Sequence, residues 1–128
     1  MQFKDIIEFP SFYNKQIKDR QLPIKISYRF SRINTSIAQE MEFYRSHLQQ
    51  ILDKYAIKDS DGKPELTEDG RGVKLSPGTE LDCEKEISEL LDTEIDLPEI
   101  KFTIDELSNA KLTLSPEDIK LLMPFLTE

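Results

Sequence analysis

The sequence predicts a mainly α-helical protein in which one long helix packs antiparallel on a second helix. Apolar residues recur with the period of an α-helix over residues 23–56, and a shorter amphipathic pattern follows over 80–93. All four glycines fall in the stretch 57–79 between them, which predicts a small β-hairpin insertion. A Ser-Pro-Glu-Asp helix start at 115–118 predicts a short C-terminal helix.

A chain of 128 residues is long enough for one domain, and we expect residues 1–128 to form one. Hydrophobic residues make up only 38% of the chain and charged residues 33%, so the expected core is thin. A long helix with a thin core must bury its apolar stripe against another segment of the chain or against a second copy. The composition is therefore compatible with a homo-oligomer.

The sequence predicts a cytoplasmic protein. It contains no run of about 20 apolar residues, so no membrane-spanning helix is predicted. The first residues lack the apolar segment of a secretory signal peptide. Cys83 is the one cysteine, so no intrachain disulfide can form, which is typical of a reducing compartment.

The N-terminal arm, residues 1–22, carries weak structural signals. Residues 2–9 fit either a short strand or a first helical turn, and Pro10 is expected to end that element. The apolar spacing that follows predicts a short helix over 11–20.

The long helix predicted over 23–56 begins at Pro23, a residue well tolerated at the first helical position. No Gly or Pro follows within it, so at about 1.5 Å per residue it would run roughly 50 Å. Its apolar stripe advances in steps of three and four through Phe30, Ile33, Ile37, Met41, Tyr44, Leu48, Leu52 and Tyr55.

The first turns of this helix are irregular. Ile24 and Tyr28 point to nearly the opposite side from the stripe, and we expect the 11–20 segment to cover them. Two alternatives stay open. Apolar and polar residues alternate over 24–30, as in a short strand, and weak helix formers around Asn34 favour a kink or a restarted helix there.

The stretch 57–79 predicts a hairpin because Asp-Gly dipeptides at 61–62 and 69–70 are strong turn signals. Thr79 is the expected N-cap of the helix over 80–93. This helix is the expected antiparallel mate of the long stripe. Its apolar side comprises Cys83, Ile87, Leu90 and Leu91.

Residues 94–128 predict a short strand and two short helices. Alternation at 100–102 indicates the strand, and a capping-box pattern at 103–106 indicates a helical turn. The signal at 115–118 starts the last helix, which Pro124 is expected to kink or end. The side chains expected to be buried by that helix are Ile119, Leu122 and Leu126.

No catalytic set, cofactor site or metal site is predicted. His47 and Cys83 are the single His and Cys, and nothing near them in the sequence would orient a catalytic pair. We interpret them as a partly buried side chain and a small apolar filler. The segment 59–68 has part of the spacing of a calcium loop, but Ile57, at its first ligand position, has no side-chain oxygen. The carboxylates of the 80–93 helix, Glu84, Glu86 and Glu89 among them, are typical of a solvated face.

Charge is distributed unevenly along the chain. Residues 1–56 carry nine Lys and Arg against six Asp and Glu, a net of +3, and residues 57–128 a net of −11. We interpret the halves as neutralising each other on folding. Three cations of the first half share one side of the long helix, as in a nucleic-acid contact, but a pI near 4.7 opposes polyanion binding. A protein partner is therefore favoured. The candidate partner surface comprises Ile24, Lys25, Tyr28, Arg29 and Arg32.

The order of several segments resembles a known family. A basic Tyr-Arg-Phe-Ser-Arg segment at 28–32 leads into the helix ending Leu-Asp-Lys-Tyr-Ala at 52–56, and two Asp-Gly turns over 58–70 precede an acidic helix at 86–91. Over residues 28–96 this looks like a family of small uncharacterised proteins encoded in temperate phages and prophages of Gram-positive bacteria. The family has no assigned activity, so the resemblance implies no site residue. It implies a setting, the bacterial cytoplasm during phage infection or the virion.

These observations predict a non-enzymatic phage or prophage accessory protein that acts through protein–protein interaction and needs no cofactor. It would bind either other copies of itself, forming a homo-oligomer, or a phage or host protein. Its expected role is that of an assembly or virion component. The alternative is an acidic inhibitor of a host or defence nucleic-acid-binding protein, because the −11 half could imitate the charge of DNA.

Overall fold

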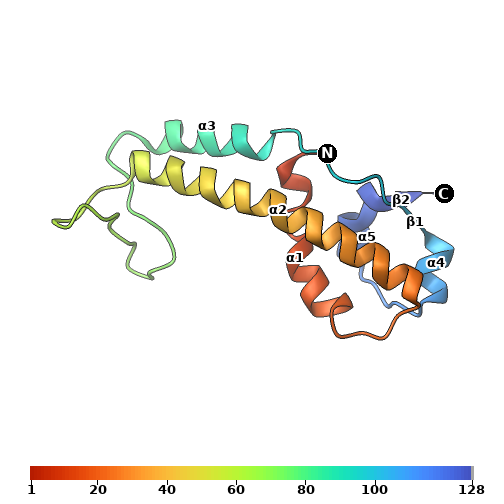
Figure 1. Ribbon diagram of the computed structural model, residues 1–128. Helices are drawn as coiled ribbons and strands as arrows, with labels where there is room; N and C mark the ends of the chain where they lie inside the picture. Colours follow the sequence, from red (N-terminus) through yellow and green to blue (C-terminus); the bar gives the residue numbers. More distant parts are fainter. Residues whose placement is uncertain (128) are drawn as a thin grey trace. The chain divides into compact units, whose positions relative to one another are not determined.

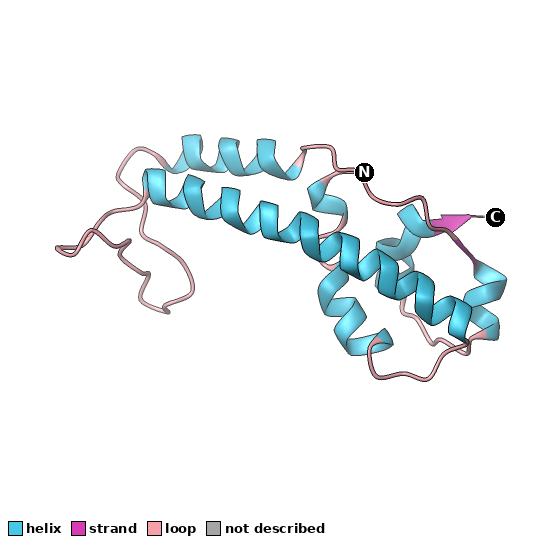
Figure 2. Cartoon of the chain, viewed as in Figure 1, coloured by secondary structure: helices cyan, strands magenta, loops and turns pink. Residues whose placement is uncertain are grey.

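The computed structural model describes residues 1–127, which are mainly helical (Figures 1 and 2). They form two compact units: the first unit is residues 1–41 with the described residues from 94 onward, and the second unit is Glu42–Thr93. The prediction of one domain over 1–128 stays a prediction. The elements in chain order are η1 (Phe3–Asp5), α1 (Phe9–Phe12), η2 (Tyr13–Ile17), α2 (Ile24–Tyr55), α3 (Glu80–Leu91), β1 (Phe102–Thr103), α4 (Ile104–Asn109), α5 (Pro116–Leu122), η3 (Met123–Phe125) and β2 (Leu126–Thr127).

The long helix is confirmed as α2, which runs without interruption from Ile24 to Tyr55. Pro23 directly precedes it, and its carbonyl accepts the backbone N–H groups of Ile26 and Ser27 at 3.0 Å. The helix continues through Asn34, so the alternatives of a restarted helix and of a strand over 24–30 are wrong. The regular apolar period outweighs the weak helix propensity of a few polar residues.

The first half of the α2 stripe is buried in an aromatic core of the first unit. The Phe30 side chain is 0% exposed and stacks on Phe102, with the ring centroids 4.4 Å apart. Phe12, from the N-terminal arm, lies 6.4 Å from the Phe30 ring. Phe9 packs edge-on against Phe125 at 5.7 Å. Both ends of the chain therefore contribute side chains to the core around α2.

The N-terminal arm is helical where the sequence left alternatives. Residues 3–5 form the 3₁₀ helix η1, so the strand alternative over 2–9 is wrong. The short helix predicted over 11–20 is present, but it begins at Phe9 and continues as one π-helical turn to Ile17. Pro10 lies in the first turn of α1, where its missing N–H group leaves no intrahelical bond unmade. The expectation that Pro10 ends an element is therefore wrong.

A parallel pair of two-residue strands joins the middle of the C-terminal segment to its end. Strand β1 is Phe102–Thr103 and pairs with β2, Leu126–Thr127, with Phe102 opposite Leu126. The strand predicted at 100–102 is thus present but begins later. Its partner has no sequence signal, because two residues are too few to show a period.

Both helix starts predicted in the C-terminal segment are confirmed in atomic detail. The Thr103 hydroxyl accepts the Glu106 N–H at 3.0 Å, and the Glu106 carboxylate accepts the Thr103 N–H at 3.1 Å. Ser115 and Asp118 exchange the same two bonds, each at 3.1 Å. Each reciprocal pair satisfies two backbone donors that a helix start would otherwise leave unpaired.

The last helix buries fewer side chains than the sequence predicts. Leu122 is 0% exposed and Leu126 is half-buried, but Ile119 is 36% exposed. Pro124 lies in the 3₁₀ helix η3 that directly follows α5, so α5 ends shortly before this proline as expected.

In the second unit, α3 runs antiparallel beside the C-terminal half of α2 (Figure 1), as predicted. Cys83 and Leu90 are buried, while Ile87 and Leu91 are half-buried. The second half of the α2 stripe is only half-buried as well, at Tyr44, Leu48, Leu52 and Tyr55. The helical hairpin is therefore thinly packed, and the larger core lies in the first unit.

The Gly-rich segment folds back through antiparallel bridges rather than extended strands. Ile57, Glu65 and Lys74 form a closed ring of backbone hydrogen bonds, each 2.8 Å long, in which every residue donates to one neighbour and accepts from the other. Gly62 and Gly70 turn the chain with φ of 78° and 71°, a region that favours glycine. The predicted hairpin turns are thus present, without regular strands among the described residues of this segment.

Lys111 offers a direct test of backbone strain. It follows α4 with φ of 59° and closes a Schellman motif, since its N–H donates to the Ser108 carbonyl and Leu112 N–H donates to the Leu107 carbonyl. A left-handed conformation costs a non-glycine residue about 1–2 kcal/mol. We expect Lys111→Gly to raise the free energy of unfolding, measured by urea titration, by about 0.5–1 kcal/mol. The gain is smaller than the relieved strain because glycine also makes the unfolded chain more flexible. Lys120→Gly, inside α5, should instead lower it by about 1 kcal/mol.

Candidate functional site

The first two turns of α2 expose apolar side chains on the face opposite the core. The Ile24 side chain is 84% exposed and Tyr28 is 61% exposed, whereas Ile26 and Phe30 are buried. At 100° per residue, Ile24 and Tyr28 lie roughly opposite Ile33 of the stripe. The helix therefore has two apolar faces here, and only one is covered by the described part of the chain.

The expectation that the 11–20 segment covers Ile24 and Tyr28 is wrong. That segment packs Phe12 against Phe30 on the stripe side of α2. The Phe12 side chain is 5% exposed, so it is almost completely buried in the aromatic core. The arm therefore covers the larger apolar face and leaves the smaller one to solvent.

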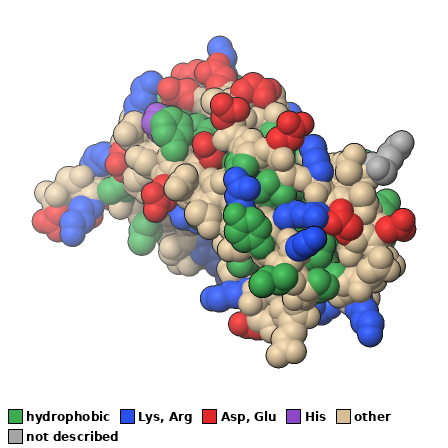
Figure 3. Space-filling view, turned by 45° about the vertical axis from the view of Figure 1, so that its right-hand side comes forward, with side chains coloured by type: hydrophobic (Ala, Val, Ile, Leu, Met, Phe, Trp, Pro, Cys, Tyr) green, Lys and Arg blue, Asp and Glu red, His purple; other side chains and the backbone are tan. Residues whose placement is uncertain are grey.

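Cations flank the two exposed apolar residues. Lys25 and Arg32 are exposed, and the Arg32 guanidinium carbon lies 5.9 Å from the centroid of the Tyr28 ring. This separation is within the range of a cation–π interaction, which orients both side chains along the helix. Figure 3 shows green hydrophobic side chains among blue Lys and Arg side chains on one face of the molecule. We call the four residues Ile24, Lys25, Tyr28 and Arg32 the α2 face.

Arg29, the fifth predicted surface residue, instead has a structural role. Its side chain is half-buried and ion-paired with Glu106 of α4. It also donates to the Lys101 carbonyl at 3.3 Å and lies 5.6 Å from the Phe102 ring centroid. These contacts tie α2 to β1 and α4, so the Arg29 side chain is already engaged within the chain.

The Arg29–Glu106 contact predicts a pH dependence of stability. The Thr103 N–H bond and then the Arg29 guanidinium lower the pKa of Glu106 below its usual value. Because the folded state disfavours protonation, this contribution is present above the unfolded pKa of about 4.3 and is lost as pH falls through the folded pKa. We expect Glu106→Gln to reduce the loss of unfolding free energy between neutral pH and pH about 3, measured by urea titration.

Two features make that measurement specific to Glu106. The pKa values of Asp69 and Glu86 are also lowered, by Thr67 and by Tyr55 respectively, but they titrate in both proteins and cancel in the comparison. Glu99→Gln, which removes one exposed carboxylate, is the matched control for the loss of a negative charge. An unaltered profile in Glu106→Gln would contradict the assignment.

Cys83 and His47, the residues considered for catalysis, are packed against other side chains. The Cys83 side chain is 1% exposed, and burial, then Glu86 and Glu84, raise the pKa of its thiol, which disfavours a nucleophilic thiolate. His47 stacks on Phe43 with the ring centroids 4.0 Å apart. No group of three or more His, Cys, Asp or Glu residues in the described chain could hold a metal ion.

The Asp59 turn also has a structural explanation. The Asp59 carboxylate accepts the backbone N–H groups of Asp61 and Lys63, at 2.9 and 3.0 Å. These bonds close the turn that contains Gly62, as Asp commonly does in loops. The side chain that the calcium-loop spacing would use thus organises its own turn.

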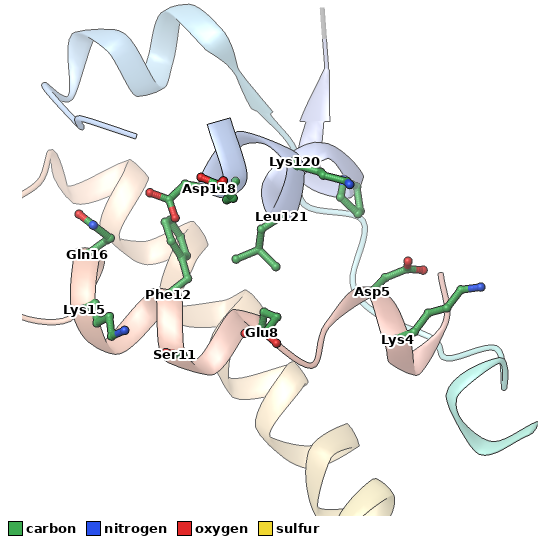
Figure 4. A pocket seen from close by; sticks show the side chains of 12 residues that line it. Lys4, Asp5, Glu8, Ser11, Phe12, Lys15, Gln16, Asp118, Lys120 and Leu121 are labelled. Atoms are coloured by element: carbon green, nitrogen blue, oxygen red, sulfur yellow. The ribbon is translucent and has the colours of Figure 1, made fainter. Parts of the chain in front are cut away.

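A groove of about 520 Å³ lies in the first unit between the N-terminal helices and α5 (Figure 4). Phe12 and Leu121 contribute apolar surface, while its charged residues are of both signs, such as Lys15 and Glu8. The Asp118 carboxylate at its edge already caps α5 by accepting the Ser115 N–H. Sequence reasoning missed this groove because its walls lie about 100 residues apart. Its mixed charge selects no class of ligand.

No protein-family model, curated protein or solved structure matches this chain. Among residues 1–127, no helix has both the length and the apolar character needed to cross a membrane. The α2 face therefore has to be interpreted from its own geometry.

Proposed function

We propose that this chain is a non-enzymatic accessory protein that acts through protein–protein contacts made by the α2 face. The observation that supports this function is the pair of large apolar side chains, Ile24 and Tyr28, exposed on the helix side opposite the core. Burying one such side chain is worth about 1.5–3 kcal/mol, so a partner that covers both gains affinity. The flanking cations Lys25 and Arg32 favour a partner surface that carries acidic side chains.

A protein partner fits this face better than nucleic acid. Arg29 is engaged by Glu106, which leaves Lys25 and Arg32 as the exposed cations of the face. Two cations release few counterions from a nucleic-acid backbone, and the net charge of −8 repels polyanions. Ile24 offers neither charge nor a stacking ring to a base, but it packs well against apolar side chains.

The resemblance over residues 28–96 supports a setting for this activity. We place the protein in the bacterial cytoplasm during phage infection or in the phage particle, as an accessory or assembly component. Mass spectrometry of purified phage particles, compared with the cytoplasm of infected cells, distinguishes the two locations. Absence from both samples of a phage that carries the gene would contradict the proposed setting.

The test of the α2 face is Tyr28→Asp in affinity capture from phage-infected cells. We expect the variant to lose its captured partner, with at least about a 30-fold weaker affinity once the partner is purified, as for a hot-spot residue worth 2 kcal/mol or more. The substitution replaces a 61% exposed side chain, so circular dichroism and unfolding should change little. Leu66→Asp is the matched control, because it places the same charge on a 58% exposed residue of the Gly-rich segment. Equal binding by both variants would contradict the proposal.

A second candidate function is supported by the charge of α3. Glu84 and Glu89 are exposed on this helix, and acidic side chains gather over it in Figure 3. An acidic inhibitor of a host or defence nucleic-acid-binding protein would use such a surface. Glu86 is unsuitable as a probe, because its carboxylate pairs with Lys54 at 3.1 Å. Inhibition that survives Glu84→Lys with Glu89→Lys would exclude this surface.

A further inference from the structure

The outer face of α3 carries one large apolar side chain among acidic residues. Leu81 is 81% exposed, although Cys83 and Leu90 of the same helix are buried. On the helical wheel, Glu84 lies on one side of Leu81 and Glu89 on the other, with Lys85 between Leu81 and Glu89, and all three charged residues are exposed. We call Leu81, Glu84 and Glu89 the α3 face.

The α2 face also has an apolar centre, with exposed charges of the opposite sign along one side of it. Ile24 and Tyr28 are its apolar centre, and Lys25 and Arg32 are its exposed cations. Each face presents a helix surface about two turns long, a size that another helix can cover by packing side by side. One chain therefore carries two helical surfaces that complement each other in charge and in apolar character.

We infer that the partner of the α2 face is the α3 face of a second copy of this chain. This inference rests on the proposed function and names its partner. Leu81 of one copy packs against Tyr28 of the next, while Glu84, on one side of Leu81, faces the cations Lys25 and Arg32. Opposite charges in contact favour this register, and two copies of the same face repel each other.

The contact joins two different surfaces, so it is heterologous. Each copy that docks its α3 face keeps its own α2 face free for another copy. Such contacts produce closed rings or open chains of copies rather than a simple two-fold dimer. Because the paired charges are exposed, assembly should weaken as salt is raised.

The test uses the whole chain and two charge-reversed variants. Multi-angle light scattering over a concentration series should show a wild-type mass rising above the 14.9 kDa of one chain, and returning toward it in high salt. Lys25→Glu with Arg32→Glu gives an acidic α2 face, and Glu84→Lys with Glu89→Lys gives a basic α3 face. Each variant alone should stay at the mass of one chain. An equal mixture should assemble again, because every junction then joins opposite charges.

Matched controls separate docking from net charge. Lys63→Glu with Lys74→Glu, and Glu42→Lys with Glu68→Lys, change the net charge by the same amounts at exposed residues outside both faces. Both controls should assemble like the wild type. Circular dichroism of each variant should match the wild type, as expected if it folds. Leu81→Ala, which alters no charge, should also weaken assembly.

Three results would overturn the inference: a wild-type chain of 14.9 kDa at every concentration, reversed variants that still assemble, or a mixture that does not assemble although the wild type does. Its failure is distinguishable from failure of the proposed function. A monomeric wild type whose captured foreign partner is lost in Tyr28→Asp would retain the α2 face as a binding surface and exclude the second copy as its occupant.

Discussion

Phe30→Ala is expected to lower the free energy of unfolding by about 3–5 kcal/mol, the usual cost of deleting a buried aromatic side chain. The Phe30 side chain is 0% exposed, and its ring stacks on Phe102 and contacts Phe12. Truncation would therefore leave a cavity where the N-terminal arm, α2 and β1 meet. A loss of this size is a large share of the 5–15 kcal/mol that stabilises a typical domain.

Chemical denaturation followed by circular dichroism measures this loss. Phe43→Ala on the same helix is the matched control, because the Phe43 side chain is 50% exposed and should cost no more than about 1 kcal/mol. Similar losses in the two variants would show that the aromatic core of the first unit does not dominate stability.

Phe9→Ala is expected to cost a similar 3–5 kcal/mol, although Phe9 lies in an arm whose sequence signals are weak. The Phe9 side chain is 0% exposed and meets Phe12 at 5.9 Å and Phe125 at 5.7 Å. The N-terminal arm is therefore part of the core of the first unit and not an appendage to it.

A double-mutant cycle distinguishes the aromatic contact from general loss of volume. Phe9→Ala, Phe125→Ala and the double variant should show a coupling of about 0.5–1.5 kcal/mol, as for other edge-to-face pairs. Phe9→Leu keeps most of the volume and should cost clearly less than Phe9→Ala. Strictly additive losses would show that the two rings do not stabilise each other.

The candidate partner surface stays a prediction, although the exposure of its side chains can be compared with the structure. Ile24 and Tyr28 were placed opposite the stripe by periodicity alone, and the structure leaves them exposed. The sequence could not show that Arg29 pairs with Glu106, because the two residues lie 77 positions apart. The sequence also placed the 11–20 segment on the wrong side of α2, because the helical period shows which faces are apolar but not which segment covers each face.

The sequence by itself determined the elements whose causes are local. The apolar period of α2, the capping boxes at Thr103 and Ser115, and the glycine turns at 62 and 70 all depend on residues within a few positions of one another. Such signals do not depend on contacts between distant parts of the chain, so they can be predicted from a short stretch of sequence.

Only the tertiary structure decided which surfaces meet. The pairing of Phe102 with Leu126, the use of Phe9 and Phe12 to bury the first half of α2, and the thin packing of its second half have no local signal. These contacts are selected by how much apolar surface each alternative buries, a comparison that involves the whole chain at once. The exposed α2 face is what that selection leaves over, and it is the surface that a partner would cover.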